Sequence, residues 1–561
     1  MEDLQIRLGY ALPERKIGKG AYRFSERGQS FSMKKLNISQ SNSIQPSSPA
    51  EDKIRIPLSI PIHPYLRDHT SHGNIIFPAV EILQWLAASL QKHDPDAPVH
   101  CMQSASFDRF LRIDENSPAL EACHELEKDD NGCFSSRLIT TGLTPEKTIR
   151  RTKVHAVVNF AAPVMNDPLP MDIAACLDGV AFEVPAADLY RELVPFGPSY
   201  HNVIGNLILT EDGALGQVRA AEYPALSVPL GSPFPFDGAL HAACVWGQRY
   251  YGMVGFPVGF RQRTILRPTI PGENYLLRVL PFSSPDHQPN QTLQYDIRIY
   301  SLKGELYEEI NGVLMKDVSG GRTQPPDWIL AESPRSANPP LYNIRSHCRG
   351  LVLIESRAVS DFADTALTPF EHKRFDKMGS KRKRDFLTGH LALKHLARIV
   401  NNDRITPASQ INTVAHDGIK PEIAFTGSTI FCSLSHDVRF AVAVADDMPV
   451  GIDVERVSAR VMKSMHLFAS DRESTLIEES ELGLIEACLR VWSIKECVSK
   501  AIDHPFAECW KIVNVHRIGK CESLLTVSGD DYLAFHDAID EHLFTLVKKG
   551  VYALRRGTQQ S

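Results

Sequence analysis

Residues 449–455 read Pro-Val-Gly-Ile-Asp-Val-Glu, and residues 492–500 read Trp-Ser-Ile-Lys-Glu-Cys-Val-Ser-Lys. The first segment alternates as a β-strand does, so Asp453 and Glu455 are expected to point to the same face. The second segment has helical spacing, which places three side chains on one stripe: Trp492, Glu496 and Lys500. Brought together, the carboxylates form the kind of oxygen cage that magnesium prefers: Asp453, Glu455 and Glu496. The two segments therefore predict a metal site between a strand and a helix.

Taken in this order, the segments 451–455 and 492–500 resemble the signature of the surfactin-type 4′-phosphopantetheinyl transferases. The resemblance implies that the phosphopantetheine arm of coenzyme A moves to a serine of an apo acyl carrier protein, releasing 3′,5′-ADP. It implies Mg²⁺ as the cofactor, held by the three carboxylates, and catalytic roles for Glu496 and Lys500. It also implies an α/β domain of two similar halves, related by a pseudo-twofold axis, with the active site between them.

Residues between the two segments and upstream of them fit the coenzyme A end of that reaction. The resemblance assigns Lys420, Ser435 and His436 to the 3′-phosphate and adenosine, because a phosphate needs cationic and hydroxyl donors. A basic run at 381–384 begins a helix-like stretch, and Arg384 is included in the coenzyme A site. The same run also fits a solvated helix face or a surface for an acidic carrier protein.

The carboxylate that accepts the serine proton is left open by the sequence. Glu496 is one candidate, and the acidic stretch 471–486 offers others. Related enzymes have a glutamate four residues after a phenylalanine here, but Arg472 stands at that position after Phe468. His390, where many relatives have arginine, is a second departure.

The N-terminal half carries a different set of motifs. His-x-x-x-Gly-x-x-x-x-Pro occurs at His69, Gly73 and Pro78, and a stretch with helical periodicity follows at 79–90. Phe-Gly-Pro at 196–198 comes much later, and a second helix-like run opens with Asp237 and His241. Together these motifs resemble the dehydratase domains of polyketide and polyunsaturated fatty acid synthases. The resemblance implies a double hotdog, in which two long helices are each wrapped by a curved antiparallel sheet.

The implied reaction removes water from a 3-hydroxyacyl thioester. His69 would be the base that takes the proton from C2, and Asp237, its pKa raised in a dry tunnel, would be the acid. His241 would orient Asp237 from one helical turn away. The backbone N–H near Gly73 would polarise the thioester carbonyl. His72 is a competing choice for the base, although His69 fits the phase of the motif.

Composition sets the broad class of the protein. The 561 residues are 43% hydrophobic and 23% charged, with a formal net charge of −6, which gives no reason to expect nucleic acid or an anionic membrane as partner. No run of about 18 apolar residues appears, so no membrane span is expected. Eleven cysteines without a Cys-x-x-Cys pair favour free thiols in a reducing cytoplasm.

Stretches rich in Ser, Pro and Gly divide the chain, which we expect to be an α+β protein. The predicted parts are a flexible tail at 1–52, a double hotdog at 53–318, a linker at 319–341 and a transferase domain at 342–561. The enediyne-type polyketide synthases end in the same pair of domains. The leading hypothesis is a bifunctional enzyme whose shared partner is an acyl carrier protein.

Two alternatives stay open at this point. The double hotdog could be a non-catalytic module that docks carrier proteins or acyl chains beside an active transferase. The chain could also be the severed end of a larger synthase, working only in complex with it, with the 1–50 segment as a docking tail. Dehydratases of this type often pair, so the resemblance also implies a homodimer through the dehydratase region.

Overall fold

The structure is a computed structural model, and it describes most of the chain. The described residues are 53–71, 73–143, 150–162, 177–222, 229–282, 292–330, 339–356, 362–403, 406–413 and 430–550. The predicted tail, His72 and Lys420 lie outside these residues.

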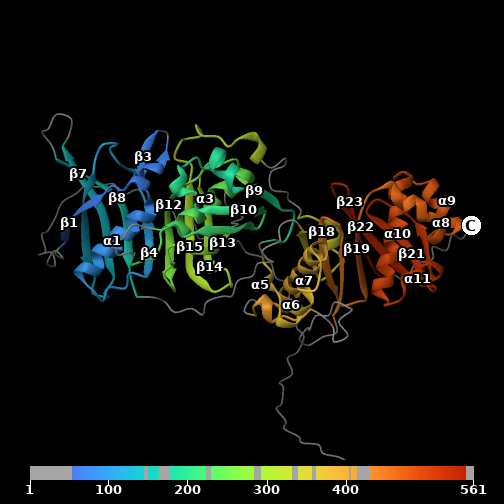
Figure 1. The fold of residues 1–561 in the computed structure, drawn as a ribbon. Helices are drawn as coiled ribbons and strands as arrows, with labels where there is room; N and C mark the ends of the chain where they lie inside the picture. The colour runs from blue at the N-terminus through green and yellow to red at the C-terminus, as the bar shows by residue number, and fades with distance from the viewer. Residues whose placement is uncertain are drawn as a thin grey trace, which may run out of the picture. The chain divides into compact units, whose positions relative to one another are not determined.

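One antiparallel sheet runs through the N-terminal region (Figure 1), with the strand order β1-β6-β7-β8-β4-β12-β15-β14-β13-β11-β10-β9. The first half contains β1 (Ile54–Pro61), β6 (Ala119–Lys128), β7 (Phe134–Leu143), β8 (Arg150–Phe160) and β4 (Cys101–Ser106). The second half contains β12 (Phe256–Ile265), β15 (Leu306–Lys316), β14 (Thr292–Ser301), β13 (Asn274–Pro281), β11 (Gly213–Arg219), β10 (Val203–Thr210) and β9 (Phe182–Pro185). The pairing of β4 with β12 joins the halves into one sheet.

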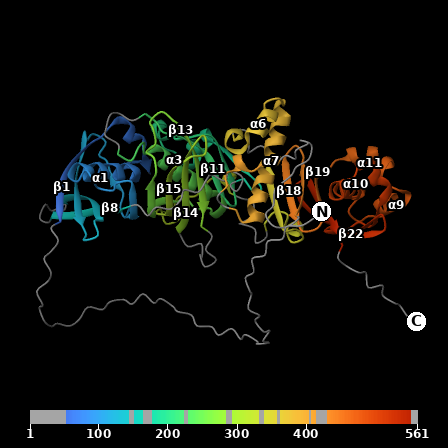
Figure 2. The ribbon, with the colours of Figure 1, turned by 90° about the horizontal axis from the view of Figure 1, so that it is seen from below.

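Each half of this sheet wraps one long helix. Helix α1 (Ala79–His93) lies against β6, β7 and β8, and α3 (Phe234–Tyr251) lies against β10, β11, β13 and β14 (Figures 1 and 2). The apolar residues of α1 recur at helical spacing and are buried: Val80, Leu83, Leu86, Ala87 and Leu90. Helix α3 is buried over almost its whole length, from Phe234 to Gln248. This arrangement confirms the predicted double hotdog.

Short elements connect the strands at the ends of the two helices. They are η1 (Pro64–Asp68), β2 (Thr70–Ser71), β3 (Asn74–Phe77), β5 (Leu111–Arg112), α2 (Ala186–Asp188), the π-helix η3 (Leu189–Leu193) and η4 (Pro198–Tyr200). Gly73 occupies the exposed turn between β2 and β3. Strands β2 and β3 therefore form a small hairpin, and β3 leads directly into α1.

The C-terminal region consists of two α/β halves. In the first half α7 (Ser380–Asn401) packs on a sheet of β16 (Gly350–Glu355), β18 (Phe440–Asp446) and β17 (Phe431–His436). In the second half α10 (Leu484–Ala501) packs on a sheet of β19 (Val450–Arg456), β23 (His542–Lys549), β22 (Asp530–Ile539), β21 (Glu522–Val527) and β20 (Val513–Arg517). Strands β17 and β19 lie next to each other, so the two halves meet there.

A buried ion pair recurs in both halves and reveals their relationship. In the first half Lys394 of α7 contacts Glu371 at 2.7 Å, and Glu371 closes a capping box at the start of α6 (Pro369–Phe375). In the second half Lys495 of α10 contacts Glu473 at 2.8 Å, and Glu473 closes the same kind of box at the start of α9 (Asp471–Glu478). The repeated arrangement supports the predicted pseudo-twofold construction.

Shorter elements complete the C-terminal region and the segment before it. They are η5 (Asp327–Ile329), α4 (Tyr342–Arg345), α5 (Ala363–Ala366), η7 (Ala408–Gln410), η8 (Ala459–Ser464), α8 (Met465–Phe468) and α11 (Phe506–Ile512). Among the described residues, no helix combines the length and the apolar character needed to cross a membrane.

Several contacts link the N-terminal region with the C-terminal one. Asp178 forms a β-bridge with Ile354 of the outer strand β16, and the Gly179 N–H donates to Leu353 O at 2.8 Å. Apolar side chains of both regions share one buried cluster that includes Leu177, Ile208, Leu215, Leu276, Val352, Leu391 and Ala443. Residues 177–179 thus cover an edge of the C-terminal sheet.

Candidate active sites

Strand β19 and helix α10 approach each other closely enough to bring the acidic side chains of both segments together. A side chain at Gly451 would place its Cβ 1.9 Å from the carbonyl oxygen of Cys497, so only glycine allows this approach. One carboxylate oxygen from each of three acidic residues lies within 4.8 Å of the other two: Asp453, Glu455 and Glu496. The predicted strand, helix and carboxylate cluster are therefore brought together in one place.

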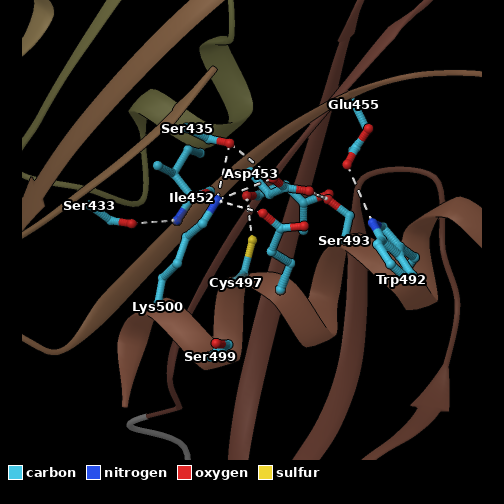
Figure 3. A network of polar contacts seen from close by, with 12 residues as sticks. Ser433, Ser435, Ile452, Asp453, Glu455, Trp492, Ser493, Cys497, Ser499 and Lys500 are labelled. Carbon is cyan, nitrogen blue, oxygen red and sulfur yellow. Dashed lines mark hydrogen bonds and ion pairs between the residues drawn. The ribbon is translucent and has the colours of Figure 1, made fainter. Parts of the chain in front are cut away.

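Asp453 is the most deeply held of the three carboxylates, with 1% of its surface exposed. Its Oδ1 accepts hydrogen bonds from Ser435 Oγ at 2.9 Å and from Lys500 Nζ at 3.2 Å, and its Oδ2 accepts from Ser493 Oγ at 2.6 Å (Figure 3). Glu455 accepts a hydrogen bond from the indole N–H of Trp492 at 3.3 Å. This network fixes the orientation of two of the ligands before any ion arrives.

Burial and the repulsion between the carboxylates of the cluster change the pKa values of Glu455 and Glu496. Burial, Asp453 and Glu496, in that order, raise the pKa of Glu455 to about 7. Burial and Asp453 raise the pKa of Glu496 as well. Burial opposes the charge of Lys500, but the attraction of Asp453 and Glu496 is larger and raises its pKa. Three crowded carboxylates with one lysine form a site that a divalent cation would stabilise.

The donor set fits Mg²⁺, which takes oxygen ligands and leaves positions for water and phosphate. All three candidate ligands are carboxylates, and they converge. Burial and, after it, the neighbouring carboxylates raise the pKa values of Glu455 and Glu496. A second metal chemistry, such as a zinc site of Cys and His ligands, has no support in this group of residues.

An open cleft of about 820 Å³ lies in front of the cluster. Its lining includes Ser435, His436, Asp453, Glu455, Trp492, Glu496 and Lys381. Ser435 lines the cleft, but its hydroxyl is already engaged by Asp453 and by Lys500 at 3.1 Å. His436 is exposed at the cleft. Of the residues expected to bind coenzyme A, Ser435 and His436 therefore face the same space as the carboxylates.

Two other residues expected in the site, Arg384 and Lys500, do not line the cleft. Arg384 is exposed and does not line the cleft, whereas Lys381 of the same basic run does. Three residues apart on one helix, these two side chains point about 60° away from each other. Lys500 also stays out of the lining, because its ammonium group bonds to Asp453, Glu496 and the carbonyl oxygen of Ile452.

Glu473 is removed from the candidates for the proton acceptor. Its carboxylate caps α9 by accepting from the Ser470 N–H at 2.9 Å, binds Lys495 and accepts from the Val515 N–H at 2.9 Å. With 1% of its surface exposed, it has no access to a substrate. Sequence reasoning missed Ser493 as a partner of Asp453, although its place three residues before Glu496 puts both on one helix face.

In the N-terminal region His69 lies at the end of η1, where it lines a separate cavity. Its Nδ1 lies 2.8 Å from the carbonyl oxygen of Ile76, so Nδ1 carries the hydrogen and Nε2 is left as an acceptor. Burial lowers the pKa of His69, and this effect exceeds the opposing pull of Asp237. A neutral imidazole with an open Nε2 has the properties of a base.

Asp237 enters the same cavity from the first turn of α3. Its Oδ2 lies 3.1 Å from His241 Nε2 and accepts a hydrogen bond from Asn202 Nδ2 at 3.2 Å. The hydroxyl of Tyr190 lies 3.2 Å from His241 Nδ1 and accepts from the Val203 N–H at 2.7 Å. His241 is thus held between Tyr190 and Asp237, as its i+4 spacing from Asp237 predicted. Tyr190, on the π-helix η3, was not found from the sequence.

The protonation expected for Asp237 is corrected by these contacts. Burial is the largest influence on the pKa of Asp237 and raises it, but His241, His69 and Asn202 together outweigh burial, so the pKa is lowered. The free site therefore holds Asp237 ionised rather than protonated. A dry cavity raises the pKa of an acid only where no positive partner is near.

The Phe-Gly-Pro motif supports His69 from the other half of the double hotdog. A Cβ at Gly197 would lie 2.5 Å from Cγ of Asp68, the residue before His69. The Gly197 N–H donates to the Asp68 carbonyl at 2.8 Å, and the Ser199 N–H donates to its carboxylate at 2.9 Å. The ring of Phe196 packs 4.3 Å from that of His69 between centroids. The Phe-Gly-Pro motif at 196–198 therefore positions the segment that contains His69.

The cavity between the two halves has a volume of about 360 Å³ and contains His69, Asp237 and His241 in its lining. Most of its wall is apolar, with Ile76, Phe77, Val80, Phe107, Phe196, Leu240 and Met315. Gly73 is not among the lining residues, since it lies at the exposed turn of the β2–β3 hairpin. The role expected of a backbone N–H near Gly73 stays a prediction.

Solved structures similar to this chain include several dehydratase domains. A trans-AT polyketide synthase dehydratase from Brevibacillus brevis has 14% identity and a TM-score of 0.38, with 47% of this chain and 94% of that chain covered. The dehydratase of the CurJ module of curacin polyketide synthase has 17% identity and a TM-score of 0.39, covering 48% and 93%. The RzxB dehydratase from Pseudomonas fluorescens has 14% and 0.35, covering 44% and 86%. The double-hotdog assignment itself rests on the sheet and the two helices described above.

No curated protein matches this chain. The family model of the 4′-phosphopantetheinyl transferase superfamily matches residues 449–549. This range begins just before β19 and ends with β23, so it contains Asp453, Glu455, Glu496 and Lys500. The C-terminal region of this chain therefore carries a domain of the 4′-phosphopantetheinyl transferase superfamily.

Proposed function

We propose that the chain is a bifunctional enzyme that acts on acyl carrier proteins. The C-terminal region, bounded at 342–561, would transfer 4′-phosphopantetheine from coenzyme A to a carrier serine. The N-terminal region, bounded at 53–318, would convert a 3-hydroxyacyl carrier protein to the 2-enoyl form. The observation that carries the first activity is the carboxylate cluster at the cleft, inside the range that matches the transferase family.

For the transfer, we assign Asp453, Glu455 and Glu496 to a Mg²⁺ ion. The ion, when bound, supplies positive charge to the pyrophosphate of coenzyme A. The serine oxygen forms a bond to the β-phosphorus, and the bond from that phosphorus to the oxygen of 3′,5′-ADP breaks. Glu496, half-buried at the cleft, takes the serine proton. Lys500 holds Asp453 and Glu496 in place.

The nucleotide end of coenzyme A would occupy the open part of the cleft. His436 and Lys381 line it and offer an imidazole and an ammonium group to phosphate oxygens. Arg384 and Lys420 stay in the proposal as further cations for the same phosphates. The cleft volume of about 820 Å³ is ample for a ligand of this size.

For the dehydration, His69 Nε2 takes the C2 proton while the C3–O bond breaks. The leaving hydroxyl departs as water with a proton supplied by the Asp237–His241 pair. This assignment follows from the distance of 3.1 Å between Asp237 Oδ2 and His241 Nε2, across which the two groups can share a proton. The proton on His69 then returns to the pair through water, which completes the cycle. Tyr190 keeps the His241 ring in place.

A mass measurement on an apo carrier protein tests the transferase. Incubated with coenzyme A and Mg²⁺, the carrier should gain the phosphopantetheine mass with the wild type, and neither Asp453→Ala nor Glu496→Ala should support that gain. Glu478→Ala is the matched control, because Glu478 is an exposed acid on α9. Full activity in both site variants would contradict the metal assignment.

Dehydration is tested on the same carrier after loading with a 3-hydroxyacyl chain. Loss of one water should occur with wild type and with Asp453→Ala, whose transferase site alone is damaged. His69→Ala and Asp237→Asn should stop the water loss and leave the transferase intact. If wild-type protein removes no water from chains of several lengths, the double hotdog is a docking module instead.

A further inference from the structure

The segment between β15 and the C-terminal region folds back onto the N-terminal cavity. Residues 319–330, here named the strap, belong to the stretch that the sequence predicted to be a linker. Thr323 and Gln324 of the strap line the cavity that contains His69 and Asp237. Thr323 is half-buried and Gln324 is exposed, which places this part of the strap at the outer end of the cavity.

The strap is tied down at both ends. At its start, Asp317 accepts hydrogen bonds from the Ser319 N–H at 2.7 Å and the Gly321 N–H at 2.6 Å, and Ser319 Oγ accepts from the Thr323 N–H at 3.0 Å. At its end, two hydrogen bonds join the strap to the double hotdog. Trp328 Nε1 donates to Glu192 at 2.5 Å, and the Ile329 carbonyl accepts from Arg249 at 3.2 Å. The Ile329 side chain is completely buried. A segment fixed in this way can hold a ligand rather than merely connect two regions.

The side chains that the strap contributes differ chemically from the inner wall. Much of the rest of the lining is apolar, with residues such as Leu193, Val194, Leu240, Val254 and Met315. The strap instead presents a hydroxyl and a carboxamide. Gln324 Nε2 donates one hydrogen to the Gly321 carbonyl at 2.7 Å, which fixes the amide plane, and a carboxamide has a second N–H and an oxygen besides.

We propose that Thr323 and Gln324 hydrogen-bond the amide groups of the pantetheine arm that carries the acyl substrate. This inference rests on the proposed dehydratase function. With the thioester carbons at His69 and Asp237, the arm must pass through the outer end of the cavity. The amides of the arm lose water there and need protein partners, which an apolar wall does not provide. The strap supplies such partners and so selects pantetheine-linked substrates.

The test compares two 3-hydroxyacyl thioesters that differ only in the length of the arm. One is the pantetheine thioester and the other is the shorter N-acetylcysteamine thioester. The double variant Thr323→Val/Gln324→Leu should raise KM for the pantetheine thioester about 3- to 10-fold, which is the loss of about one hydrogen bond. Its kcat should stay unchanged, and KM for the shorter thioester should change less than twofold. Asp327→Asn, on the strap outside the cavity lining, is the matched control and should change neither value.

Equal changes in KM for both thioesters, or no change for either, would overturn the proposal. Calorimetric binding of a saturated acyl-pantetheine thioester, which has no hydroxyl to lose, separates this result from a failure of the proposed dehydration. Weaker binding in the double variant supports the strap contact even in a protein that removes no water. Unchanged binding rejects the contact whether or not the wild type is active.

Discussion

The buried pair of Lys495 and Glu473 permits a quantitative prediction. Replacing Lys495 with methionine keeps the volume of the side chain but removes the ammonium group. That group has no exposed surface and bonds to Glu473 at 2.8 Å and to the carbonyl oxygen of Phe468 at 2.6 Å. The variant leaves Glu473 as a buried carboxylate with only neutral donors around it.

Breaking a buried pair by removing one partner costs about 3–5 kcal/mol, since the remaining charge cannot return to water. Glu473 keeps the Ser470 and Val515 N–H groups, so the lower half of that range applies. A loss of about 3–4 kcal/mol corresponds to a drop of about 10²- to 10³-fold in the equilibrium that keeps this part folded. The transferase should lose activity in parallel, because Lys495 precedes Glu496 on α10.

Hydrogen exchange resolved by peptide is the assay, because it reports the stability of individual elements. Amides of α9 and β20 should exchange about 10²- to 10³-fold faster in Lys495→Met, while those of α1 and α3 keep their rates. Lys394→Met is the matched variant, since it breaks the equivalent pair with Glu371 in the other half. It should speed exchange in α6 and α7 and spare α9 and β20.

The double variant Lys495→Met/Glu473→Leu removes both charges. It should be more stable than the sum of the two single losses, because no charge is left buried. A change in exchange of less than tenfold in Lys495→Met would refute the reasoning. It would mean that Glu473 finds water or takes up a proton at little cost.

Three further outcomes are expected in the N-terminal region. Burial lowers the pKa of His69 below 6.5, so this base stays neutral at more acidic pH than a free histidine does. The acidic limb of log kcat/KM for dehydration should therefore have an apparent pKa below 6.5. An apparent pKa above 6.5 would contradict the assignment of His69 as the base. Tyr190→Phe removes the hydroxyl next to His241 and should lower kcat about 2- to 10-fold without changing KM, measured with circular dichroism as the folding control. Gly197→Ala should push Asp68 away and destabilise the double hotdog by about 1–3 kcal/mol in urea unfolding, with transferase activity retained.

The strand, the helix and their shared carboxylates could be predicted because periodicity determines side-chain direction. A period of two puts Asp453 and Glu455 on one face, and a period of 3.6 aligns Glu496 with Lys500. Periodicity does not reveal whether the ammonium group of a lysine extends into the cleft or binds neighbouring groups in the folded protein. Lys500 is bonded to its own neighbours instead of extending into the cleft, because Ser435 and Ile452 O lie within hydrogen-bond distance of it.

The features that the sequence did not predict correctly also have physical explanations. The pKa of Asp237 depends on the positions of His241 and His69 in space, and the sign of the shift follows from whether charge or burial dominates. Tyr190 lies on a π-helix of one turn, which is too short to leave a periodic signal. The strap has the Gly and Pro content of a linker, yet its hydrogen bonds to Asp317 and Glu192 are invisible in composition.

The bridge between Asp178 and Ile354 bears on how the chain is made. An outer strand exposes unpaired N–H and C=O groups that can recruit a second chain. Ribosomes complete residues 177–179 long before β16 emerges, so the segment that covers this edge exists before the edge does. The Leu353 N–H of this strand donates to the Asp178 carboxylate at 2.9 Å. Because residues 177–179 belong to the same chain, they occupy this edge without having to be recruited from solution.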